Sequence, residues 1–405
     1  MIKIENKADC CGCTSCVASC HKNAITMVTD EEGFLYPKVN PQKCNNCGFC
    51  ESACPIIFRN KHAVQTNTIR EIYAVRHKDN DKLKKSSSGG AFSALADYVI
   101  KQDGCVVGVG YTEDMKVVHS IANTIEGYYQ FRGSKYVQSD MSGVFQQIKE
   151  ILQANRLVLF TGTPCQVEGL KLYLRKEYDN LITVDLICHG VASPLIFRNH
   201  IEYLNSYYND QVVGLSMRDK EDHGWDQIHA CKYSFKSGKS ITNPKGLTKW
   251  SQMYFSNLIN RPSCHECRFT NLNRAGDITI ADFLDLQNMR KDIMSKEGTS
   301  LMLVNSEKGK EVYEKNKEVF HVWPSNLTEA MQPCLKSPVR MPLKRDAFWD
   351  YFYTNGYNKT YDKYFKPNWK KSLLSFCRKT PALKHMGHFV KLIYKNLKYS
   401  SFCFL

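Results

Sequence analysis

Residues 10–20 read CCGCTSCVASC, and residues 44–54 read CNNCGFCESAC. Both stretches contain the pattern C-x-x-C-x-x-C-x-x-x-C, which makes them an internal repeat. Three thiolates at steps of three residues can surround one face of a cuboidal cluster, and the fourth cysteine ligates the other cluster of a pair. The repeat therefore predicts a small domain that holds two 4Fe-4S clusters.

Crossed ligation divides eight cysteines into two ligand sets. The first set is Cys10, Cys13, Cys16 and Cys54, and the second is Cys20, Cys44, Cys47 and Cys50. Gly12 and Gly48 let the backbone pass close to the inorganic sulfides. We interpret Cys11 as a bystander. Structural zinc is the alternative, but zinc sites typically use two separated cysteine pairs.

The composition places these cysteines in a reducing compartment. The chain has 405 residues, 18 of them cysteine, and the hydrophobic share of 43% is enough for a core in two or three domains. No apolar run approaches ~18 residues, and the first residues lack the apolar segment of a secretion signal. We therefore expect a cytoplasmic protein whose clustered cysteines bind metal instead of forming disulfides.

The formal charge of +15 is unevenly distributed. Residues 367–405 contain eight basic residues and no acidic one. No nucleic-acid-binding module is recognisable, so we expect no nucleic-acid partner. The aromatic and basic tail is interpreted as a helix that packs on the body or on a partner, and the alternative is peripheral contact with an anionic membrane.

Apolar strand-like runs alternate with helical patterns through most of the chain, which predicts α/β architecture. Strands are predicted at 105–111, 117–122, 157–160, 182–187, 212–217, 277–281 and 300–304. Helices are predicted at 91–102, 144–154, 166–177, 194–207, 248–259 and 307–319. The predicted division is a small α+β cluster domain (1–57), a linker (58–70), a larger α/β domain (71–345) and a basic, partly helical C-terminal region (346–405).

Four further cysteines fall in the larger domain. Cys165 and Cys188 each follow a predicted strand, and Cys264 and Cys267 form C-H-E-C. If the two strands are parallel neighbours, both thiols lie at the same sheet edge, where α/β proteins bind ligands. The four could complete a third 4Fe-4S site. Alternatives are an activated nucleophile at Cys165, and structural zinc or a redox dithiol at the C-H-E-C pair.

A serine-rich turn predicts an anion site. Residues 86–90 read SSSGG and precede a predicted helix, where hydroxyls and free backbone N–H groups bind phosphate. The alternative is a helix cap with a flexible loop. The turns 108–111, 132–138 and 162–164 could join the site, with Arg132 and Lys135 as phosphate partners. None of these turns matches a dinucleotide fingerprint or a P-loop.

Taken together, these residues resemble the beta-subunit family of coenzyme F420 hydrogenases and dehydrogenases. The resembling stretches are residues 86–91, 132–140, 160–166, 185–190, 218–220, 224–225, 261–269 and 277–283. With the cysteine repeat, the match covers roughly residues 8–285. Such coverage in a consistent order is much more specific than any one motif.

The resemblance implies an iron–sulfur flavoprotein oxidoreductase. It implies FAD in the larger domain, bound by Ser86, Ser87, Ser88, Gly89, Gly90, Arg132, Ser134, Lys135 and Thr163. It also implies that Cys165, Cys188, Cys264 and Cys267 hold a third 4Fe-4S cluster. Candidates for positioning or proton transfer are His189, Asp282 and Lys135.

The function implied is a redox relay. Flavin exchanges a hydride with a small-molecule two-electron substrate, and the clusters pass single electrons to or from a redox protein or enzyme. Archaeal members use reduced deazaflavin, whereas similar bacterial chains resemble companions of polysaccharide biosynthesis enzymes. The competing interpretation is an electron-transfer subunit without chemistry of its own.

Overall fold

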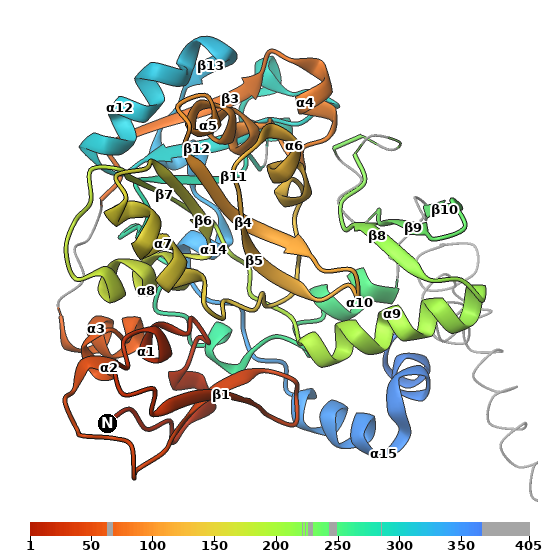
Figure 1. The fold of residues 1–405 in the computed structure, drawn as a ribbon. Helices are drawn as coiled ribbons and strands as arrows, with labels where there is room; N and C mark the ends of the chain where they lie inside the picture. The colour runs from red at the N-terminus through yellow and green to blue at the C-terminus, as the bar shows by residue number, and fades with distance from the viewer. Residues whose placement is uncertain are drawn as a thin grey trace, which may run out of the picture. The chain divides into compact units, whose positions relative to one another are not determined.

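The computed structural model describes residues 1–62, 68–220, 222, 224–225, 230–242, 249–284 and 286–366 (Figure 1). The basic tail, with its predicted membrane contact, lies outside these residues. The chain forms two compact units, Met1–Asp350 and Tyr351–Leu405. The first unit carries every predicted site residue, and it combines a small ferredoxin-like N-terminal region with a large α/β region, which confirms the predicted fold class.

An eight-stranded mixed sheet forms the centre of the large region (Figure 1). Its order is β13-β3-β12-β11-β7-β6-β4-β5. The strands are β3 (Glu71–His77), β4 (Cys105–Tyr111), β5 (Val117–Ala122), β6 (Val158–Gly162), β7 (Leu181–Leu186), β11 (Ile278–Asp282), β12 (Ser300–Val304) and β13 (Phe320–Pro324). The central strands β11, β7, β6 and β4 are parallel, and β12, β5 and β13 pair antiparallel with their neighbours.

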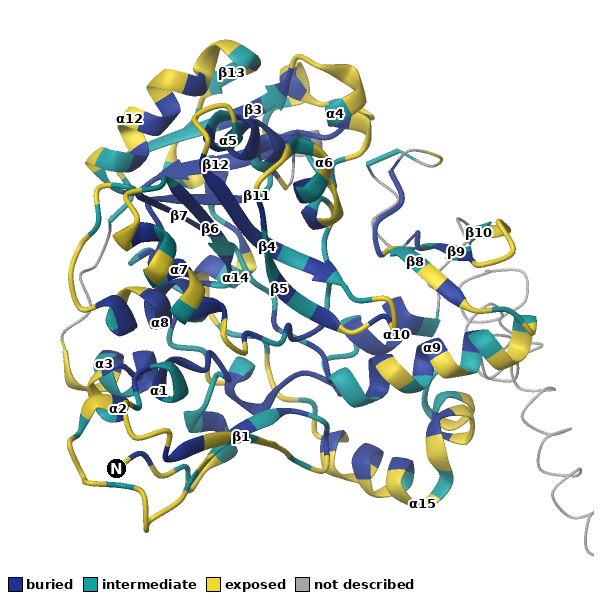
Figure 2. Cartoon of the chain, in the orientation of Figure 1, coloured by how far each residue is buried: buried dark blue, intermediate teal, exposed yellow. Residues whose placement is uncertain are grey.

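Alternation along the strands produces two apolar faces. Val106 and Leu159 belong to the core cluster under helices α5 and α12, whereas Val107 and Phe160 belong to the cluster under α7 and α8. Figure 2 shows the strands of this sheet mostly in the colour of buried residues. The sheet therefore has helices on both faces, as a largely parallel sheet requires.

Local sequence sets where the helices begin. Helix α8 begins after Thr163, which forms a capping box with Gln166, and proline occupies its first turn. Helix α5 begins after Gly90, whose φ of 84° favours glycine. The main helices of the large region are α4 (Asn80–Lys84), α5 (Ala91–Ile100), α6 (Ile125–Tyr128), α7 (Val144–Gln153), α8 (Pro164–Leu174), α9 (Pro194–Tyr208), α10 (Lys249–Phe255), α11 (Leu286–Met289), α12 (Glu307–Asn316), α13 (Leu327–Ala330) and α14 (Pro333–Lys336). Helix α15 (Arg345–Tyr364) begins in the first unit and continues into the second.

The N-terminal region consists of a hairpin and short helices. These are β1 (Ile25–Thr29), β2 (Leu35–Val39), α1 (Ser15–Ala18), α2 (Phe49–Ser52) and α3 (Pro55–Lys61). The first four residues of the predicted linker are therefore helical. A separate antiparallel sheet contains β8 (Val212–Ser216), β9 (Lys232–Phe235) and β10 (Ser240–Thr242). No described helix is long and apolar enough to cross a lipid bilayer.

Buried charged groups join the N-terminal region to the rest of the first unit. Arg59 of α3 pairs with Glu168 of α8, and Arg345 pairs with Glu32 of the hairpin turn. All four side chains are at most 10% exposed. Ser15 also donates a hydrogen bond of 2.7 Å to the carbonyl of Gly169. The small region is thus packed firmly on helix α8.

Candidate functional site

The first cysteine set of the repeat lies at the inner side of the N-terminal region. Cys13, Cys16 and Cys54 are buried, and the charges of Cys10 and Cys54 act on Cys16. The charge of Cys54 also contributes to raising the pKa of Cys13. Cys54 therefore lies near Cys10, Cys13 and Cys16, and Cys50 of the second set also acts on Cys16, so crossed ligation stays a prediction. Cys13 also packs against Gly169 of α8. A Cβ atom added to Gly169 would lie only 3.0 Å from Sγ of Cys13.

The second set surrounds its own cavity at the outer side. Cys20, Cys44, Cys47 and Cys50 line this cavity together with Gly48 and Phe49. Backbone N–H groups donate to two of the sulfurs, from Ala24 to Cys20 at 3.3 Å and from Ile2 to Cys50 at 3.4 Å. Such bonds stabilise thiolate ligands of a cluster. Cys47 is exposed, so this site lies close to solvent.

The four cysteines of the large region meet at one sheet edge. Strands β6 and β7 are parallel neighbours, so the thiols that follow them lie at the same edge. Cys165, Cys188, Cys264 and Cys267 line a single cavity there. Among the described residues, no three His, Cys, Asp or Glu side chains converge closely enough for one metal ion. Four thiols that line one cavity without converging on a single point fit the predicted 4Fe-4S cluster, which stays a prediction at these residues.

The nucleophile alternative for Cys165 does not agree with its surroundings. A hydrogen bond with the thiol of Cys11, together with burial, raises the pKa of Cys165 well above its ordinary value. A nucleophile activated by a helix N-terminus would have a lowered pKa. The surroundings of Cys165 therefore favour the ligand interpretation, and the nucleophile stays an alternative prediction. Burial likewise raises the pKa of Cys264 to about 12 and that of Cys267 to about 11.

Two cysteines that the sequence left without a role also line this cavity. Cys11 comes from the N-terminal repeat and hydrogen bonds with both Cys13 and Cys165. Cys334 comes from α14, with its Sγ 3.8 Å from Nδ1 of His189. The sequence offered a hint of the position of Cys11, because Cys11 stands beside the predicted ligand Cys10. It offered none for Cys334, which is isolated in the sequence. Cys11 thus connects the first and third cysteine groups.

A buried guanidinium fixes this junction. Arg261 is fully buried and donates to the carbonyls of Cys10 (2.7 Å) and Leu35 (2.9 Å) and to the side-chain oxygen of Gln138 (2.7 Å). Gln138 in turn donates to the carbonyl of Cys11 at 3.1 Å. The turn carrying Cys10 and Cys11 is therefore held from the large region, close to Cys264.

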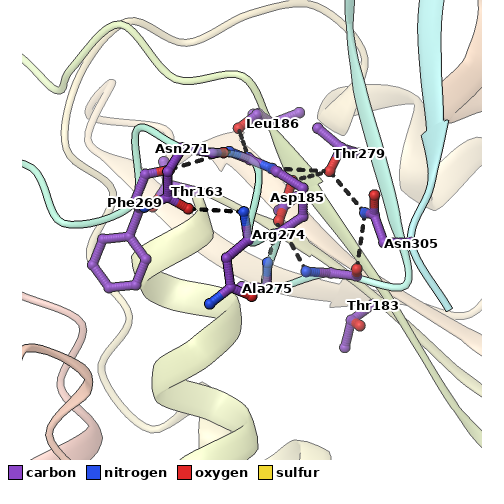
Figure 3. Close-up of polar contacts among 12 residues, drawn as sticks. Thr163, Thr183, Asp185, Leu186, Phe269, Asn271, Arg274, Ala275, Thr279 and Asn305 are labelled. Atoms are coloured by element: carbon purple, nitrogen blue, oxygen red, sulfur yellow. Dashed lines mark hydrogen bonds and ion pairs between the residues drawn. The ribbon is translucent and has the colours of Figure 1, made fainter. Parts of the chain in front are cut away.

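A second buried network holds the segments that carry Cys188, Cys264 and Cys267 (Figure 3). Asp185 near the end of β7 pairs with Arg274 at 2.8 Å, and both side chains are at most 1% exposed. Arg274 also donates to the carbonyls of Phe269, Asn271 and Leu186. The pair therefore ties the segment after the C-H-E-C motif to the end of the strand that precedes Cys188.

The serine turn lies at the same edge as the third cysteine group. Strand β3 runs in the direction of β11, because each pairs antiparallel with β12. The turn follows β3, and a Cβ atom on Gly89 would lie 2.3 Å from the carbonyl of Val75. Oγ of Ser87 accepts a hydrogen bond of 2.9 Å from the backbone N–H of Ser134. The structure thus brings together the two segments that the resemblance assigned to one cofactor.

The room beside this turn fits a bound anion. A Cβ atom on Gly133 would meet nothing closer than Oγ of Ser87, at 4.0 Å. The hydroxyls of Ser86 and Ser88 instead donate to the carbonyls of Lys82 (2.7 Å) and Thr299 (2.9 Å). Because the N–H and the hydroxyl of Ser134 both donate to Ser87, the donors left for a phosphate are the hydroxyl of Ser87 and the backbone N–H groups at the start of α5.

A buried lysine that the sequence did not single out supports the turn. The ammonium group of Lys220 donates to the carbonyls of Leu83, Ser88 and Glu297. Burial lowers the pKa of Lys220 to about 8. The sequence could have indicated this role, because Lys220 lies in one of the stretches that carry the family resemblance. Its structural part is to hold the serine turn against the loop before β12.

Arg132 and Lys135, the predicted phosphate partners, make contacts with groups outside the serine turn. The guanidinium of Arg132 stacks 3.7 Å from the ring centroid of Tyr129. The ammonium of Lys135 donates to the carbonyls of Gln130 (2.7 Å) and Arg132 (2.8 Å), and burial lowers its pKa to about 7. Thr163 lines the third cysteine cavity, with its hydroxyl 3.1 Å from Sγ of Cys165. Thr163 is therefore placed beside the cysteines and not beside the serine turn.

The remaining candidates, Asp282 and His189, flank a row of aromatic rings. Asp282 ends β11, forms an ion pair with Arg218 and accepts a hydrogen bond of 3.0 Å from Trp225. His189 bonds through Nε2 to Asn257 at 2.8 Å and lines the cysteine cavity. The ring of Tyr136 stacks on that of Tyr254 with their centroids 4.6 Å apart. The ring centroids of Tyr254 and His189 are 5.5 Å apart. Tyr136 also bonds to Arg218.

Comparison with known proteins identifies the family of the chain. The family model for the N-terminal part of the coenzyme F420 hydrogenase/dehydrogenase beta subunit matches residues 72–146, and the model for its C-terminal part matches residues 155–327. A 4Fe-4S dicluster domain matches residues 9–56. The chain belongs to the F420 hydrogenase/dehydrogenase beta-subunit family. Membership and the dicluster domain assign it a role in electron transfer as an iron–sulfur oxidoreductase.

Individual members of the F420 beta-subunit family are distant from this chain. A coenzyme F420-dependent sulfite reductase of Methanocaldococcus jannaschii is 23% identical over 320 residues, which cover 76% of the chain and 46% of the reductase. The chain thus spans about half the length of this curated relative. A solved chain of the F420-reducing [NiFe] hydrogenase complex of Methanosarcina barkeri is 19% identical, with a TM-score of 0.44 and coverage of 74% of this chain and 92% of that one.

Proposed function

We propose that the chain transfers electrons between a two-electron substrate, through FAD, and one-electron partners, through three 4Fe-4S clusters. The observation that carries the proposal is the shared sheet edge, where the serine turn after β3, Asp282 after β11 and the thiols after β6 and β7 all lie. The N-terminal cysteine sets adjoin this edge through Cys11. A flavin at the serine turn and a cluster at the third cysteine group would thus lie at one edge, with the N-terminal cysteine sets beyond Cys11.

The residues have distinct parts in this proposal. When bound, FAD would supply hydride exchange and the clusters would supply one-electron transfer. Ser87 and the start of α5 would bind the phosphates. Asp282 is held by Arg218 and Trp225, so its carboxylate keeps one orientation at the edge. His189, oriented by its bond to Asn257, would hold or move a proton beside the thiols.

The substrate remains a prediction from the family resemblance. It is a two-electron donor or acceptor, either a reduced deazaflavin or an organic intermediate of polysaccharide biosynthesis. All described cysteines are free thiols, which supports the proposal of a reducing, cytoplasmic location. The competing function is an electron-transfer subunit that contains the clusters and lacks flavin chemistry.

Cofactor analysis tests the proposal directly. Anaerobically purified protein should contain about twelve irons, with matching sulfide, and about one FAD per chain. Steady-state assays with deazaflavin, nicotinamide and dye donors follow. Protein that contains the irons but neither binds flavin nor oxidises any two-electron donor would establish the electron-transfer subunit instead.

The third cluster has its own test. Cys264→Ser should lose about four irons per chain, because a 4Fe-4S cluster needs four thiolate ligands. Cys231→Ser is the control, since Cys231 is a cysteine of the large region that does not line the cavity. The control should keep the wild-type iron content and visible spectrum. Equal iron in Cys264→Ser and wild type would exclude the third cluster at these residues.

Cys11 gives a sharper variant series at the same site. Its thiol already contacts Cys165, so we expect it to replace that ligand when Cys165 is removed. Cys165→Ser should therefore retain more iron than Cys264→Ser, and the double variant Cys11→Ser/Cys165→Ser should lose the whole third cluster. Equal iron in the single and double Cys165 variants would show that Cys11 cannot serve as a ligand.

A further inference from the structure

A large cavity lies outside the sites described so far. It has a volume of about 1010 Å³ and lies between α2 and α3 of the N-terminal region and the C-terminal half of α8. Apolar side chains of these helices contribute to its wall, among them Ile57, Phe58 and Leu172. Leu181 of β7 also lines it, so the cavity lies at the amino ends of the parallel strands. It is therefore at the opposite edge of the sheet from the serine turn and the third cysteine group.

Cations surround this cavity. We call Lys61, Lys171, Arg175, Lys176 and Lys308 the basic face. Within the described part of the chain, none of the five has a carboxylate within ion-pair distance. Lys61 and Lys171 do act on the charges of Glu51 and Asp277, respectively. The other three cations lie near the end of α8 and the start of α12.

The acidic residues of the lining compensate little of this charge. Glu51 is already paired with the N-terminal ammonium at 2.8 Å, and Glu307 is paired with Arg70. Asp277 is buried and accepts hydrogen bonds from Thr183 and Ser306. Glu177 is the remaining carboxylate of the lining. The face therefore presents net positive charge to solvent.

The basic face adjoins the second cysteine group. Gly48 and Phe49 line both the large cavity and the cavity of Cys20, Cys44, Cys47 and Cys50. The guanidinium of Arg175 lies 3.8 Å from the ring centroid of Phe49. Phe49 is 39% exposed. A molecule in the large cavity would thus contact Gly48 and Phe49, which also line the second cluster site.

We propose that the basic face docks an acidic one-electron carrier protein, which exchanges electrons with the second ferredoxin cluster. A 4Fe-4S cluster gives or takes one electron at a time, so its partner must be a one-electron carrier rather than a hydride donor. In the exchange the carrier loses one electron and the cluster gains it, or the reverse, with no bond made or broken. Net positive charge at the face selects an acidic partner and speeds its approach.

This proposal rests on the cluster content of the N-terminal region and on the redox function proposed above. It requires neither FAD nor the third cluster. Both can be measured separately, by iron and flavin content, so a failure of docking is distinguishable from a failure of the wider redox function.

The test measures electron transfer to an acidic carrier under anaerobic conditions. Dithionite-reduced protein is mixed in a stopped-flow instrument with an oxidised acidic flavodoxin, and the second-order rate constant is followed from low to high salt. The wild-type rate should fall about tenfold or more as salt rises, because screening removes the steering charge. The variant Lys171→Glu/Arg175→Glu/Lys176→Glu should be about tenfold or more slower at low salt and should approach wild type at high salt.

A control with the same change in charge isolates the face. Lys84, Lys236 and Lys344 are exposed and lie before α5, after β9 and before α15. Their triple replacement by Glu should leave the rate within about twofold of wild type. Lys176→Glu alone serves as a milder variant if the triple variant folds poorly, and iron content is measured for every variant.

Three results would overturn the proposal. The first is a wild-type rate that does not depend on salt. The second is an equal loss of rate in the basic-face variant and the control. The third is saturable binding of free flavin mononucleotide that the basic-face variant weakens as much as it slows electron transfer. That result would identify a small-molecule site instead of a protein-docking surface.

Discussion

Replacing Asp185 with asparagine should lower the free energy of unfolding by about 3–5 kcal/mol, because breaking a buried ion pair leaves its partner's charge uncompensated. The carboxylate accepts four hydrogen bonds, donated by Arg274, Thr279 and the backbone N–H groups of Ala275 and Gly276 (Figure 3). An amide would turn one acceptor atom into a donor facing other donors. The urea midpoint of the anaerobically purified protein measures the loss.

A surface pair provides the control for this variant. Glu202→Gln makes the same chemical change in the Arg198–Glu202 pair, whose atoms are 3.7 Å apart and whose side chains are 67% and 63% exposed. Its effect should be within about 0.5 kcal/mol. The double variant Asp185→Asn/Arg274→Met should recover part of the loss by removing the unpaired buried charge. Equal midpoints for Asp185→Asn and Glu202→Gln would contradict the expected role of the network.

The same substitution should also reach the third cysteine site. Arg274 holds the segment that follows Cys267, and Asp185 lies three residues before Cys188 in the sequence. Loosening this tie moves the thiols relative to one another. Iron content should therefore fall toward that of Cys264→Ser, while the N-terminal clusters stay in place.

The second large effect is expected at the junction of the two regions. Arg261→Met keeps apolar bulk over the rings of Phe34 and Tyr36 but removes donors from Cys10, Leu35 and Gln138. Three buried hydrogen bonds from a charged donor are lost, so we expect destabilisation of about 3–5 kcal/mol, confined largely to the N-terminal region. Limited proteolysis of residues 1–62 and the oxygen sensitivity of the N-terminal clusters measure it.

Arg261→Lys separates charge from shape at this position. Lysine keeps the positive charge, but its single ammonium cannot reach three acceptors that lie in different directions. Its protease resistance should therefore fall between those of wild type and Arg261→Met. Wild-type resistance in Arg261→Met would show that the junction is held by the Arg59–Glu168 contact instead.

Much of the fold could be predicted from periodicity and turn signals. All seven predicted strands occur, and 105–111, 117–122 and 300–304 match β4, β5 and β12 residue for residue. Strands β1, β2, β3, β9, β10 and β13 were not predicted, and in β3 and β13 polar residues such as Arg76 and His321 interrupt the apolar pattern. Helix α8 begins at Pro164, two residues before the prediction, because the Thr163 capping box was not recognised.

The site was predictable where chemistry depends on spacing and unpredictable where it depends on long-range packing. The two cysteine sets followed from the repeat, and the edge location of Cys165 and Cys188 followed from the parallel-strand rule. Cys334, Arg261 and the basic face lie far along the chain from the cysteines they adjoin. Nothing local marks such residues, since their roles depend on contacts that only the folded chain creates.

The ion pair between Glu32 and Arg345 can form only late in the synthesis of the chain. Arg345 follows Glu32 by 313 residues, so a ribosome adds it roughly fifteen to sixty seconds later at ~5–20 residues per second. Until then the hairpin turn lacks its buried cation, and the carboxylate of Glu32 faces water. Arg261 and Glu168 also arrive long after the residues they hold. The cysteines of the repeat are therefore synthesised well before the residues that hold their region in place.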